Sequence, residues 1–426
     1  MRHRPPTEDM GRRTPKRIKR FLQRYDQCAP LHAALCDPRK RRGVRWAFDT
    51  IVDTLMLGML LMCKSLRDVE AKSERAGKRV PDSTLAYTLE RIDPTPFDKL
   101  MHDQVRQQHR SKAYRSRDLP IGVCAVDGKT VWVGDHLADP ACQRQDNLAG
   151  ASWQLRVIRA VLTSAPSRPC IHQQVTPADT NDMGGFEALF QTLIATYARS
   201  ELFECVTCDA GFTSKHNAGL IDDAGKAYVL GVKGNQPTLH GEMKRLLAQS
   251  TSKPDAATDW ERAHGTQIRR ELFRTAEIAG FDDWPHLRQA WLVRQTTRRR
   301  HGTETVEDRY FATNLTSNRL TPKQILRLVR LHWAIENDCF HTLDVVWKED
   351  TTAWATNAKS IEGRLPLRVL MGMRMLAYNL LTWMVRVHLR GDRARTIRWD
   401  DLRAALFDVL LATPSPLAQE VALVTT

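Results

Sequence analysis

The sequence lacks a hydrophobic run long enough to cross a membrane. Its longest apolar run, LMLGMLLMC at Leu55–Cys63, is far shorter than the roughly 18 residues that a membrane-spanning helix needs. A signal-peptide pattern is also missing, because Pro5 and Pro6 stand among basic residues at the start of the chain. We therefore expect no membrane partner, a cytoplasmic location, and a buried helix at Leu55–Cys63.

The sequence also lacks the cysteine and histidine spacings of a zinc or disulfide framework. Its nine cysteines are scattered and include a single Cys-x-x-Cys, formed by Cys205 and Cys208. Residues three apart on a strand point to opposite faces, so these two thiols cannot share a metal and are predicted core residues. His332, Glu336 and His341 do not form the HExxH pattern of a zinc enzyme. This cysteine usage favours a reducing compartment.

Acidic residues are too few to balance the basic ones. The chain has 64 Lys and Arg against 49 Asp and Glu, which gives a formal charge of +15. Residues 1–50 carry 14 basic and five acidic side chains, so they supply +9 of that excess. A strongly basic chain favours a polyanionic partner, with nucleic acid first. The alternative is a solvated basic tail without a specific partner.

The pattern of expected elements changes twice along the chain. Residues 47–72 and 85–101 are predicted to be helical. Strands are predicted at 121–133, 154–163, 170–175, 203–209 and 228–233, with helices at 186–197 and 214–223. This β-β-β-α-β-α-β order indicates an α/β fold with a mixed sheet and helices packed on it. Strands follow at 267–279, 289–297 and 305–312, and helices return after that.

We divide the chain into four segments on this basis. Residues 1–115 form a basic helical N-terminal DNA-binding domain, and 116–254 form the first part of a catalytic core. A β-rich insertion spans 255–318, and 319–426 hold a catalytic helix and a helical C-terminal region.

The stretch Thr321–Asp350 predicts one long amphipathic helix. Thr321 is a candidate N-cap, Pro322 suits the first helical position, and Gln324 completes a capping box. Apolar residues then recur at helical spacing, with Glu336 in a gap of the stripe. An acid within an apolar face is costly unless it is paired, so Glu336 is a functional-site candidate. The stripe consists of Ile325, Val329, Trp333, Phe340, Leu343 and Trp347.

Two further acids lie at or near the ends of predicted strands. Asp127 is followed by Gly128 in AVDGKT, and Asp209 follows FECVTC. Ligands gather at the carboxyl ends of strands in such sheets, so Asp127, Asp209 and Glu336 are expected to converge. Three carboxylates suit Mg²⁺, or Mn²⁺, and two such ions support phosphoryl transfer. The alternatives are an Asp-Gly turn at Asp127 and a helix N-cap at Asp209.

Several segments together resemble a known family. AVDGKT, CDA, YVLGVKGNQPTL, ERAHGTQIRRE, HWAIEN and LDVV occur in collinear order between residues 125 and 346, and DPRKRRGVRW stands at 37–46. In these motifs the chain resembles the DDE transposases of bacterial insertion sequences. It is most similar to the subgroup of H-repeat-associated proteins within the insertion-sequence-four superfamily. The resemblance covers nearly the whole chain.

The resemblance implies a ribonuclease H-like core with a β-rich insertion before the last catalytic helix. It also implies that Asp127, Asp209 and Glu336 are the catalytic, metal-binding triad, and that the enzyme acts as a homodimer in the synaptic complex. Lys129 and Lys233 are predicted phosphate contacts, with mere surface lysines as the alternative.

Asn235 and Gln236 of the KGNQ motif are further DNA-binding candidates. The chain departs from the wider superfamily around Glu336, where Val329, His332 and Leu343 replace a Tyr, an Arg and a Lys. Arg330 and Lys348 are therefore the candidates for the basic role. Two smaller departures are Trp132 in place of a basic residue and Asp182 in place of a Glu.

Three hypotheses for the function follow. The first is a transposase that cleaves double-stranded DNA at terminal inverted repeats and joins the freed 3′-hydroxyl to target DNA. The second is a decayed or co-opted transposase relative that only binds DNA. The third is a ribonuclease H-like nuclease without strand transfer.

Overall fold

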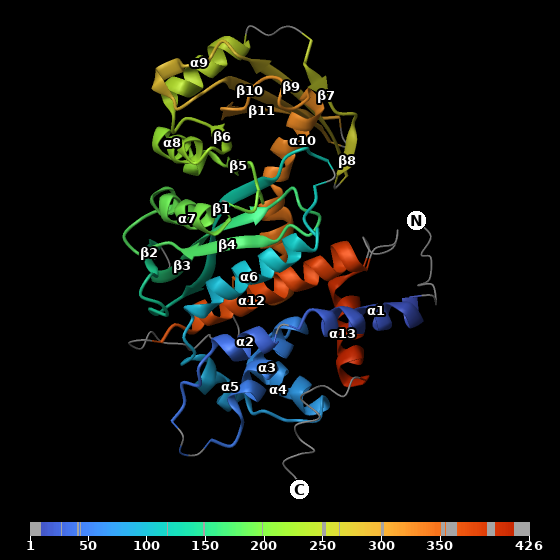
Figure 1. Ribbon diagram of the computed structural model, residues 1–426. Coiled ribbons are helices and arrows are strands. Elements are labelled where there is room, and N and C mark those ends of the chain that lie inside the picture. The colour runs from blue at the N-terminus through green and yellow to red at the C-terminus, as the bar shows by residue number, and fades with distance from the viewer. Residues whose placement is uncertain are drawn as a thin grey trace. The chain divides into compact units, whose positions relative to one another are not determined.

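The computed structural model describes residues 10–26, 28–40, 42, 44–116, 118–147, 150–197, 199–248, 253–263, 265–299, 302–350, 354, 364–389 and 397–412. The chain forms two compact units (Figure 1). Unit 1 comprises Met1–Ala113, Thr130–Arg156 and Phe340–Thr426, and unit 2 comprises Tyr114–Lys129 and Val157–Cys339.

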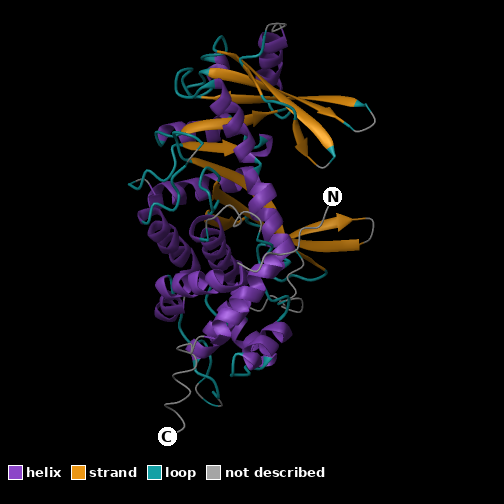
Figure 2. Cartoon of the chain, turned by 90° about the vertical axis from the view of Figure 1, so that its right-hand side faces the viewer, coloured by secondary structure: helices purple, strands orange, loops and turns teal. Residues whose placement is uncertain are grey.

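Unit 1 is mainly helical (Figure 2). Its strand β2 (Gln143–Asn147) forms a hairpin with the first half of β3 (Gly150–Leu162). Its helices are α1 (Met10–Arg24), α2 (Cys28–Ala34), α3 (Phe48–Leu60), α4 (Leu66–Arg75), α5 (Asp82–Leu89), α6 (Pro96–Arg110), α11 (His341–Trp347), α12 (Pro366–Trp383), the π-helical η4 (Met384–His388) and α13 (Trp399–Ala412). The predicted helix at 85–101 is two helices, because Pro96 starts a new one at its first turn.

The core of unit 1 forms around α12. Nearly every residue of α12 is buried, as expected of a helix that is apolar on all sides. Helix α3 is also buried along most of its length, and Leu61–Cys63 continue that buried run after the helix ends. The prediction of a buried helix at Leu55–Cys63 is therefore confirmed as far as Leu60.

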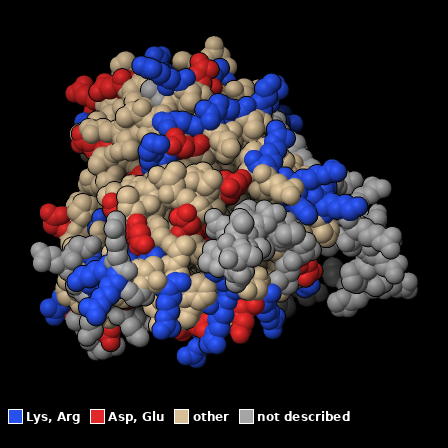
Figure 3. All heavy atoms as spheres, turned by 60° about the horizontal axis from the view of Figure 1, so that its bottom comes forward, with Lys and Arg blue, Asp and Glu red and all other residues tan. Residues whose placement is uncertain are grey.

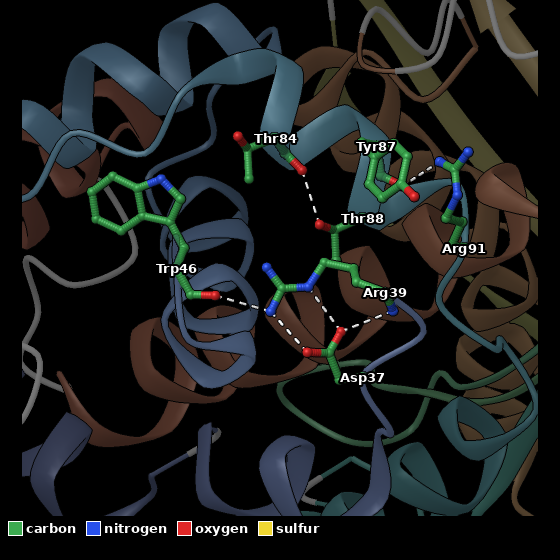
Figure 4. A network of polar contacts seen from close by, with 7 residues as sticks. All are labelled: Asp37, Arg39, Trp46, Thr84, Tyr87, Thr88 and Arg91. Atoms are coloured by element: carbon green, nitrogen blue, oxygen red, sulfur yellow. Dashed lines mark hydrogen bonds and ion pairs between the residues drawn. The ribbon is translucent and has the colours of Figure 1, made fainter. Parts of the chain in front are cut away.

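Arg39 organises the loop between α2 and α3 (Figure 4). Its guanidinium donates to both carboxylate oxygens of Asp37 at 2.8 Å and to the carbonyl oxygen of Trp46 at 2.9 Å. The Arg39 side chain is only 7% exposed. Arg39 thus shapes the loop, while the other described basic residues of the loop, Lys40, Arg42 and Arg45, are exposed.

Unit 2 is a mixed sheet with helices. The strands are β1 (Val123–Gly134), β3, β4 (Cys170–Val175), β5 (Cys205–Cys208), β6 (Ala227–Val232), β7 (Ala256–Ala257), β8 (Glu261–Ala263), β9 (Thr266–Thr275), β10 (Gln289–Arg298) and β11 (Glu304–Thr313). The helical elements are α7 (Asp182–Tyr197), η1 (Ala210–Phe212), α8 (Lys215–Asp223), α9 (Pro237–Ala248), η2 (Phe281–Asp283), α10 (Pro322–His332) and the π-helical η3 (Ile335–Phe340).

The strand order explains how the β-rich segment joins the core. The order is β3-β1-β5-β6-β11-β10-β9-β7, with β4 on β3 and β8 on β9. Strands β1, β5 and β6 run parallel, whereas β11 pairs antiparallel with β6. The segment from β7 to β11 therefore extends the central sheet. The α/β, ribonuclease H-like fold class is confirmed. Of the strands and α-helices described between residues 121 and 313, β2, β7, β8 and α9 lack a counterpart among the predicted elements.

Helix α10 packs on one face of this sheet. Ile325, Leu328 and Val329 of the helix lie in one buried cluster with Val123, Val229 and Phe311 from β1, β6 and β11. Its N-terminus has the predicted capping box. Thr321 accepts from the Gln324 backbone N–H, and the Gln324 side chain accepts from that of Thr321. Strands β1, β6 and β11, which are distant along the chain, therefore contribute to the sheet face that carries α10.

The single helix predicted over Thr321–Asp350 is wrong. After α10 the chain forms the π-helical segment Ile335–Phe340, and only then α11. A π turn holds an extra residue, which rotates the helix face, and such turns are frequent at functional sites. The buried acid of this region is Glu349, which is fully buried and pairs with the buried Arg374 at 3.3 Å in unit 1.

Candidate active site

Side-chain alternation places the candidate acids of the sheet on one face. The register pairs Val123 with Cys205 and Ala125 with Thr207 across the parallel strands β1 and β5. Both Val123 and Cys205 belong to the cluster under α10. Because successive side chains alternate between faces, Asp127 on β1 and Asp209 just after β5 point to that same face.

Asp127 and Asp209 occupy the next matched positions of these two neighbouring strands. The last registered pair is Val126 with Cys208, and one residue further along both chains reaches the two acids. Strand β1 continues through Asp127 and Gly128 to Gly134, so the alternative of an Asp-Gly turn is wrong. Asp209 caps the short helix η1 by accepting from the Gly211 N–H at 3.0 Å, while α8 is capped by Ser214.

Glu336 reaches the same face from the helical segment after α10. One helical turn earlier, His332 lies within 3.1 Å of the Thr207 hydroxyl (Nδ1 to Oγ1), and Thr207 is two residues before Asp209. Burial lowers the pKa of His332 to about 4, so this imidazole is neutral. The contact between His332 and Thr207 holds the end of α10 against β5, close to the two aspartates.

The negative charges of these acids act on one another. Burial, then the Asp209 charge, raises the pKa of Asp127 to about 7, and Glu336 and Asp182 add to the increase. Partial desolvation, then the Asp209 charge, also raises the pKa of Glu336, whereas the charges of Arg309 and Lys233 oppose that increase. Such mutual effects require the carboxylates to lie near one another in a partly desolvated place.

Glu336 differs from its expected surroundings. It is exposed, not enclosed between Trp333 and Phe340 as the apolar stripe predicts. The π-helical segment is the reason, since it rotates Glu336 out of the stripe. Asp338, the next acid, forms an ion pair with Arg168. An exposed carboxylate on this helical segment is accessible to a substrate, which a buried one is not.

Lys129 and Lys233 lie on the face of the sheet that carries the acids. Lys129 is two residues beyond Asp127 on β1, so it faces the same side. Lys233 follows the last residue of β6, is exposed, and acts electrostatically on Glu336. Their predicted contacts with phosphate are therefore compatible with their positions.

The side chains of Asn235 and Gln236 form hydrogen bonds to backbone carbonyls of the same unit. The Asn235 amide donates to the Ala210 carbonyl at 2.6 Å, and the Gln236 amide donates to the Thr213 carbonyl at 2.9 Å. Both side chains thus tie the loop after β6 to the segment that follows Asp209. This explains the KGNQ motif through loop positioning, and direct DNA contact by these two residues stays a prediction.

The two residues predicted to supply a basic group behave differently. Arg330 forms an ion pair with Glu261 of β8 at 2.7 Å. This contact connects α10 with the β-rich segment. Lys348 belongs to unit 1, is exposed, and has a positive φ of 54° at the end of α11.

Two further charged residues, Asp182 and Arg309, lie in this region, and the sequence patterns assigned neither of them to the site. A Cβ added at Gly128 would lie 2.2 Å from Oδ2 of Asp182, so the Asp182 carboxylate lies against the residue after Asp127. Arg309 of β11 lies with its Cζ 4.5 Å from the ring centroid of Trp333. Alternation within 305–312 was visible in the sequence, but the pairing of that strand with the core was not.

The donor set fits a hard divalent cation. Carboxylate oxygens are the preferred ligands of Mg²⁺ and Mn²⁺. Burial and the Asp209 charge raise the pKa of Asp127, so the ionised carboxylate is unfavourable there without a cation. Among the residues that the structure describes, no three His, Cys, Asp or Glu side chains are arranged to hold one ion. Mg²⁺ is usually held by one or two carboxylates with substrate phosphates, so pairs of these acids suffice.

The structure also describes the cysteines and the helices for which the sequence made predictions. All nine cysteines are free, and Cys205 and Cys208 are buried in β5 as predicted. Among the described helices, none combines the length and the apolar character that crossing a membrane requires.

A ribonuclease H-like sheet that carries acids on one face of neighbouring strands is typical of metal-dependent polynucleotidyl transferases. Comparison with known proteins agrees. The family model described as "Transposase DDE domain" matches residues 118–380, which is more than half of the chain. The chain belongs to this DDE transposase family. Such enzymes bind DNA, cleave it and transfer strands, with divalent metal ions.

Two relatives illustrate the similarity. The protein named "Putative transposase YncI" from Escherichia coli O157:H7 is 24% identical over 310 residues, covering 70% of this chain and 70% of its own. An "Uncharacterized protein in dhlA 3'region" from Xanthobacter autotrophicus is 30% identical over 303 residues, covering 66% of this chain and 92% of its own.

Proposed function

We propose that this chain is a transposase that cleaves the ends of its own element and transfers the freed strand into target DNA. The observation that carries the proposal is the placement of Asp127, Asp209 and Glu336 on one side of the sheet, with mutual electrostatic effects. Lys129 and Lys233 add positive charge in the same region. A decayed relative without catalysis has no need for this grouping of acids.

Each acid has a proposed role. Asp127 and Asp209 would hold the divalent ions, and Glu336 would complete the second set of ligands. When two Mg²⁺ ions are bound, they activate the attacking oxygen and stabilise the leaving oxygen. In cleavage, water forms a bond to phosphorus and the bond to the 3′ oxygen breaks, which leaves a 3′-hydroxyl. In strand transfer that hydroxyl attacks a target phosphate in the same way.

Positioning by the protein supports this chemistry. The amides of Asn235 and Gln236 fix the backbone after Asp209. The contact between His332 and Thr207 fixes the helix that leads to Glu336. Lys129 and Lys233 contact backbone phosphates and align the strand, which is where most of the catalysis of phosphoryl transfer arises.

We propose that α1 and the loop after α2 contact the element's terminal repeats. In α1, Ile18 and Phe21 are buried while Lys16, Arg20 and Arg24 are exposed. Their spacing of four residues aligns them along one side of the helix. Such a basic row neutralises DNA phosphates. Lys and Arg side chains are spread over the face of the molecule seen in Figure 3, with Asp and Glu among them.

Cleavage of a duplex cut from the DNA that flanks the gene tests the proposal. We expect Mg²⁺-dependent nicking by the parent protein, and no nicking by Asp127→Asn or Glu336→Gln. Both variants are expected to retain DNA binding in a gel-shift assay, since neither removes a positive charge. Asp118→Asn is the matched control, because Asp118 is an exposed acid of unit 2 that pairs with Arg327 at 2.6 Å.

A second assay separates the alternative functions. A pre-cleaved end with a free 3′-hydroxyl is incubated with supercoiled plasmid and Mg²⁺. Joined product supports the transposase, whereas nicking without joining indicates a nuclease that lacks strand transfer. Binding of the flanking duplex without nicking or joining indicates a DNA-binding relative without catalysis.

A further inference from the structure

Arg309 of the β-rich segment lies beside the site, although nothing in the motif pattern marks it. Strand β11 pairs antiparallel with β6, and the register ends with Tyr310 opposite Val232. The next position outward on each chain is Arg309 on β11 and Lys233 after β6. Because Phe311 faces the α10 cluster, alternation turns Arg309 to that same face.

Two like charges at facing positions of neighbouring strands are unfavourable. Such pairs destabilise a sheet unless an anion compensates them. One anion is Glu307, which accepts from Arg309 Nε at 2.8 Å and from Nη2 at 3.0 Å. A guanidinium has five N–H donors in a fixed fork, so this pair does not use them all. An arginine oriented by one carboxylate can still donate to a phosphate.

Trp333 fixes the position of the guanidinium relative to the helix. Arg309 Cζ lies 4.5 Å from the Trp333 ring centroid, which is a cation–π geometry. The same indole makes an edge contact with Phe311 at 6.4 Å between centroids. Trp333 stands three residues before Glu336 on the chain. The indole is therefore a platform that holds Arg309 next to the segment of the proposed catalytic acid.

Electrostatic effects agree with this position. The charge of Arg309, followed by that of Lys233, lowers the pKa of Glu336 against the raising effects of burial and Asp209. Positive charge therefore adjoins the acids on the side of the β-rich segment. A DNA strand that reaches the acids along β6 and β11 meets both cations.

We propose that Arg309, held by Glu307 and Trp333, binds a backbone phosphate of the DNA strand at the active site together with Lys233. The inference rests on the proposed function for the identity of the bound strand. It assigns a substrate-binding role to the β-rich segment. It also gives Trp333 of HWAIEN a role as the platform for that arginine. Arginine suits the task because its fork matches phosphate geometry.

The chain offers a matched control for this arginine. Arg294 on β10 forms the same kind of fork with Asp308, with both bonds at 2.8 Å. It also lies over an aromatic ring, 5.7 Å from the Phe273 centroid. The side-chain exposures are similar, 31% for Arg309 and 39% for Arg294. Since Arg294 is registered with Asp308 and not with Arg309, it points to the opposite face of the sheet.

Salt-dependent DNA binding tests the proposal with the full chain. Affinity for a fluorescent duplex of flanking DNA is measured by anisotropy over a series of salt concentrations, without divalent metal. A lost phosphate contact reduces the slope of log affinity against log salt by about one. We expect Arg309→Gln to show that reduction and to weaken binding by about tenfold, whereas Arg294→Gln leaves slope and affinity unchanged.

Two further variants keep the test decisive. Arg309→Lys retains a positive charge, so its slope is expected to match the parent while its affinity falls by a smaller factor. Thermal unfolding midpoints show whether each variant is folded. If Arg309→Gln is not folded, Arg309→Lys is compared with Arg294→Lys instead. In that comparison we expect weaker DNA affinity for Arg309→Lys only. Equal affinity and equal slope in the Arg309 and Arg294 variants would overturn the proposal.

The outcome is separable from that of the proposed function. Binding without metal does not depend on catalysis, and Asp127→Asn is expected to keep the parent slope. If Asp127→Asn still nicks DNA but Arg309→Gln loses its phosphate contact, the assignment of the acids fails and the Arg309 assignment stands. The reverse result leaves the triad in place and removes Arg309 from the DNA-binding surface.

Discussion

Replacing Asp127 by Asn should make the metal-free protein more stable at high pH. The folded chain raises the pKa of this carboxyl from 3.8 to about 7. A raised acid pKa means that the folded state binds the proton more tightly than the unfolded state. The group therefore costs no stability below pH 4, and the cost grows as the pH rises from 4 through 7. Above pH 7 the ionised Asp127 lowers the folding stability of the parent by its full amount, whereas the neutral Asn of the variant does not lower it.

The magnitude follows from the linkage between pKa and free energy. A change from 3.8 to about 7 corresponds to at most about 4 kcal/mol. Asp127 is only half-buried, so water and salt screen part of this effect. We expect the variant to gain about 1–2 kcal/mol at pH 8. For a unit of about 200 residues this is roughly 2–8 °C in the unfolding midpoint.

The assay is thermal unfolding in EDTA at pH 4 and pH 8, repeated at pH 8 with Mg²⁺. We expect no difference between parent and Asp127→Asn at pH 4, and a higher midpoint for the variant at pH 8. Mg²⁺ should raise the midpoint of the parent more than that of the variant, since bound cation stabilises the ionised acids. Asp118→Asn serves as the control. A variant at pH 8 that is no more stable than the parent would refute the reasoning.

Three other substitutions test separate parts of the structure. The pKa of His332 falls from 6.5 to about 4 on folding, so the stability of the parent should decrease as the pH drops from 6.5 towards 4. The urea midpoint of His332→Gln should decrease less over this pH range. An equal decrease in parent and variant would contradict a buried neutral imidazole. Gly128→Ala should displace Asp182 and abolish nicking, because the new Cβ would lie 2.2 Å from Oδ2; an unchanged nicking rate would disprove the crowding. Thr321→Ala should lose about 1 kcal/mol in urea unfolding, because the capping box with Gln324 is removed, whereas Thr321→Ser should not.

Local signals were sufficient for most elements of unit 2. Hydrophobic alternation predicted β1, β3, β4, β5, β6, β9, β10 and β11, and the capping box predicted where α10 begins. These signals work because they depend on neighbours along the chain: a strand alternates with period two, and a cap bonds within three residues. The position of Asp209 directly after β5 was predictable for the same reason, whereas Asp127 lies within β1, which continues to Gly134.

Signals that depend on packing were not readable in the sequence. Asn235 and Gln236 looked like DNA-binding residues, yet their amides bond to the backbone after Asp209. Glu336 looked enclosed in an apolar stripe, yet the acid that is buried is Glu349, which pairs with Arg374. The division into four functional segments stays a prediction. Polar side chains choose their partners only when distant segments meet.

The residues of AVDGKT, CDA and HWAIEN alone led to the acids Asp127, Asp209 and Glu336 and to the ribonuclease H-like class. Tertiary structure decided how Glu336 reaches the site, through the π-helical segment that exposes it. It also decided that Arg309 lies there, because the pairing of β11 with β6 joins segments about 80 residues apart. The period-two pattern of a strand indicates on which face of the sheet each side chain lies. Which strands pair depends on the free energy of the whole sheet and its core.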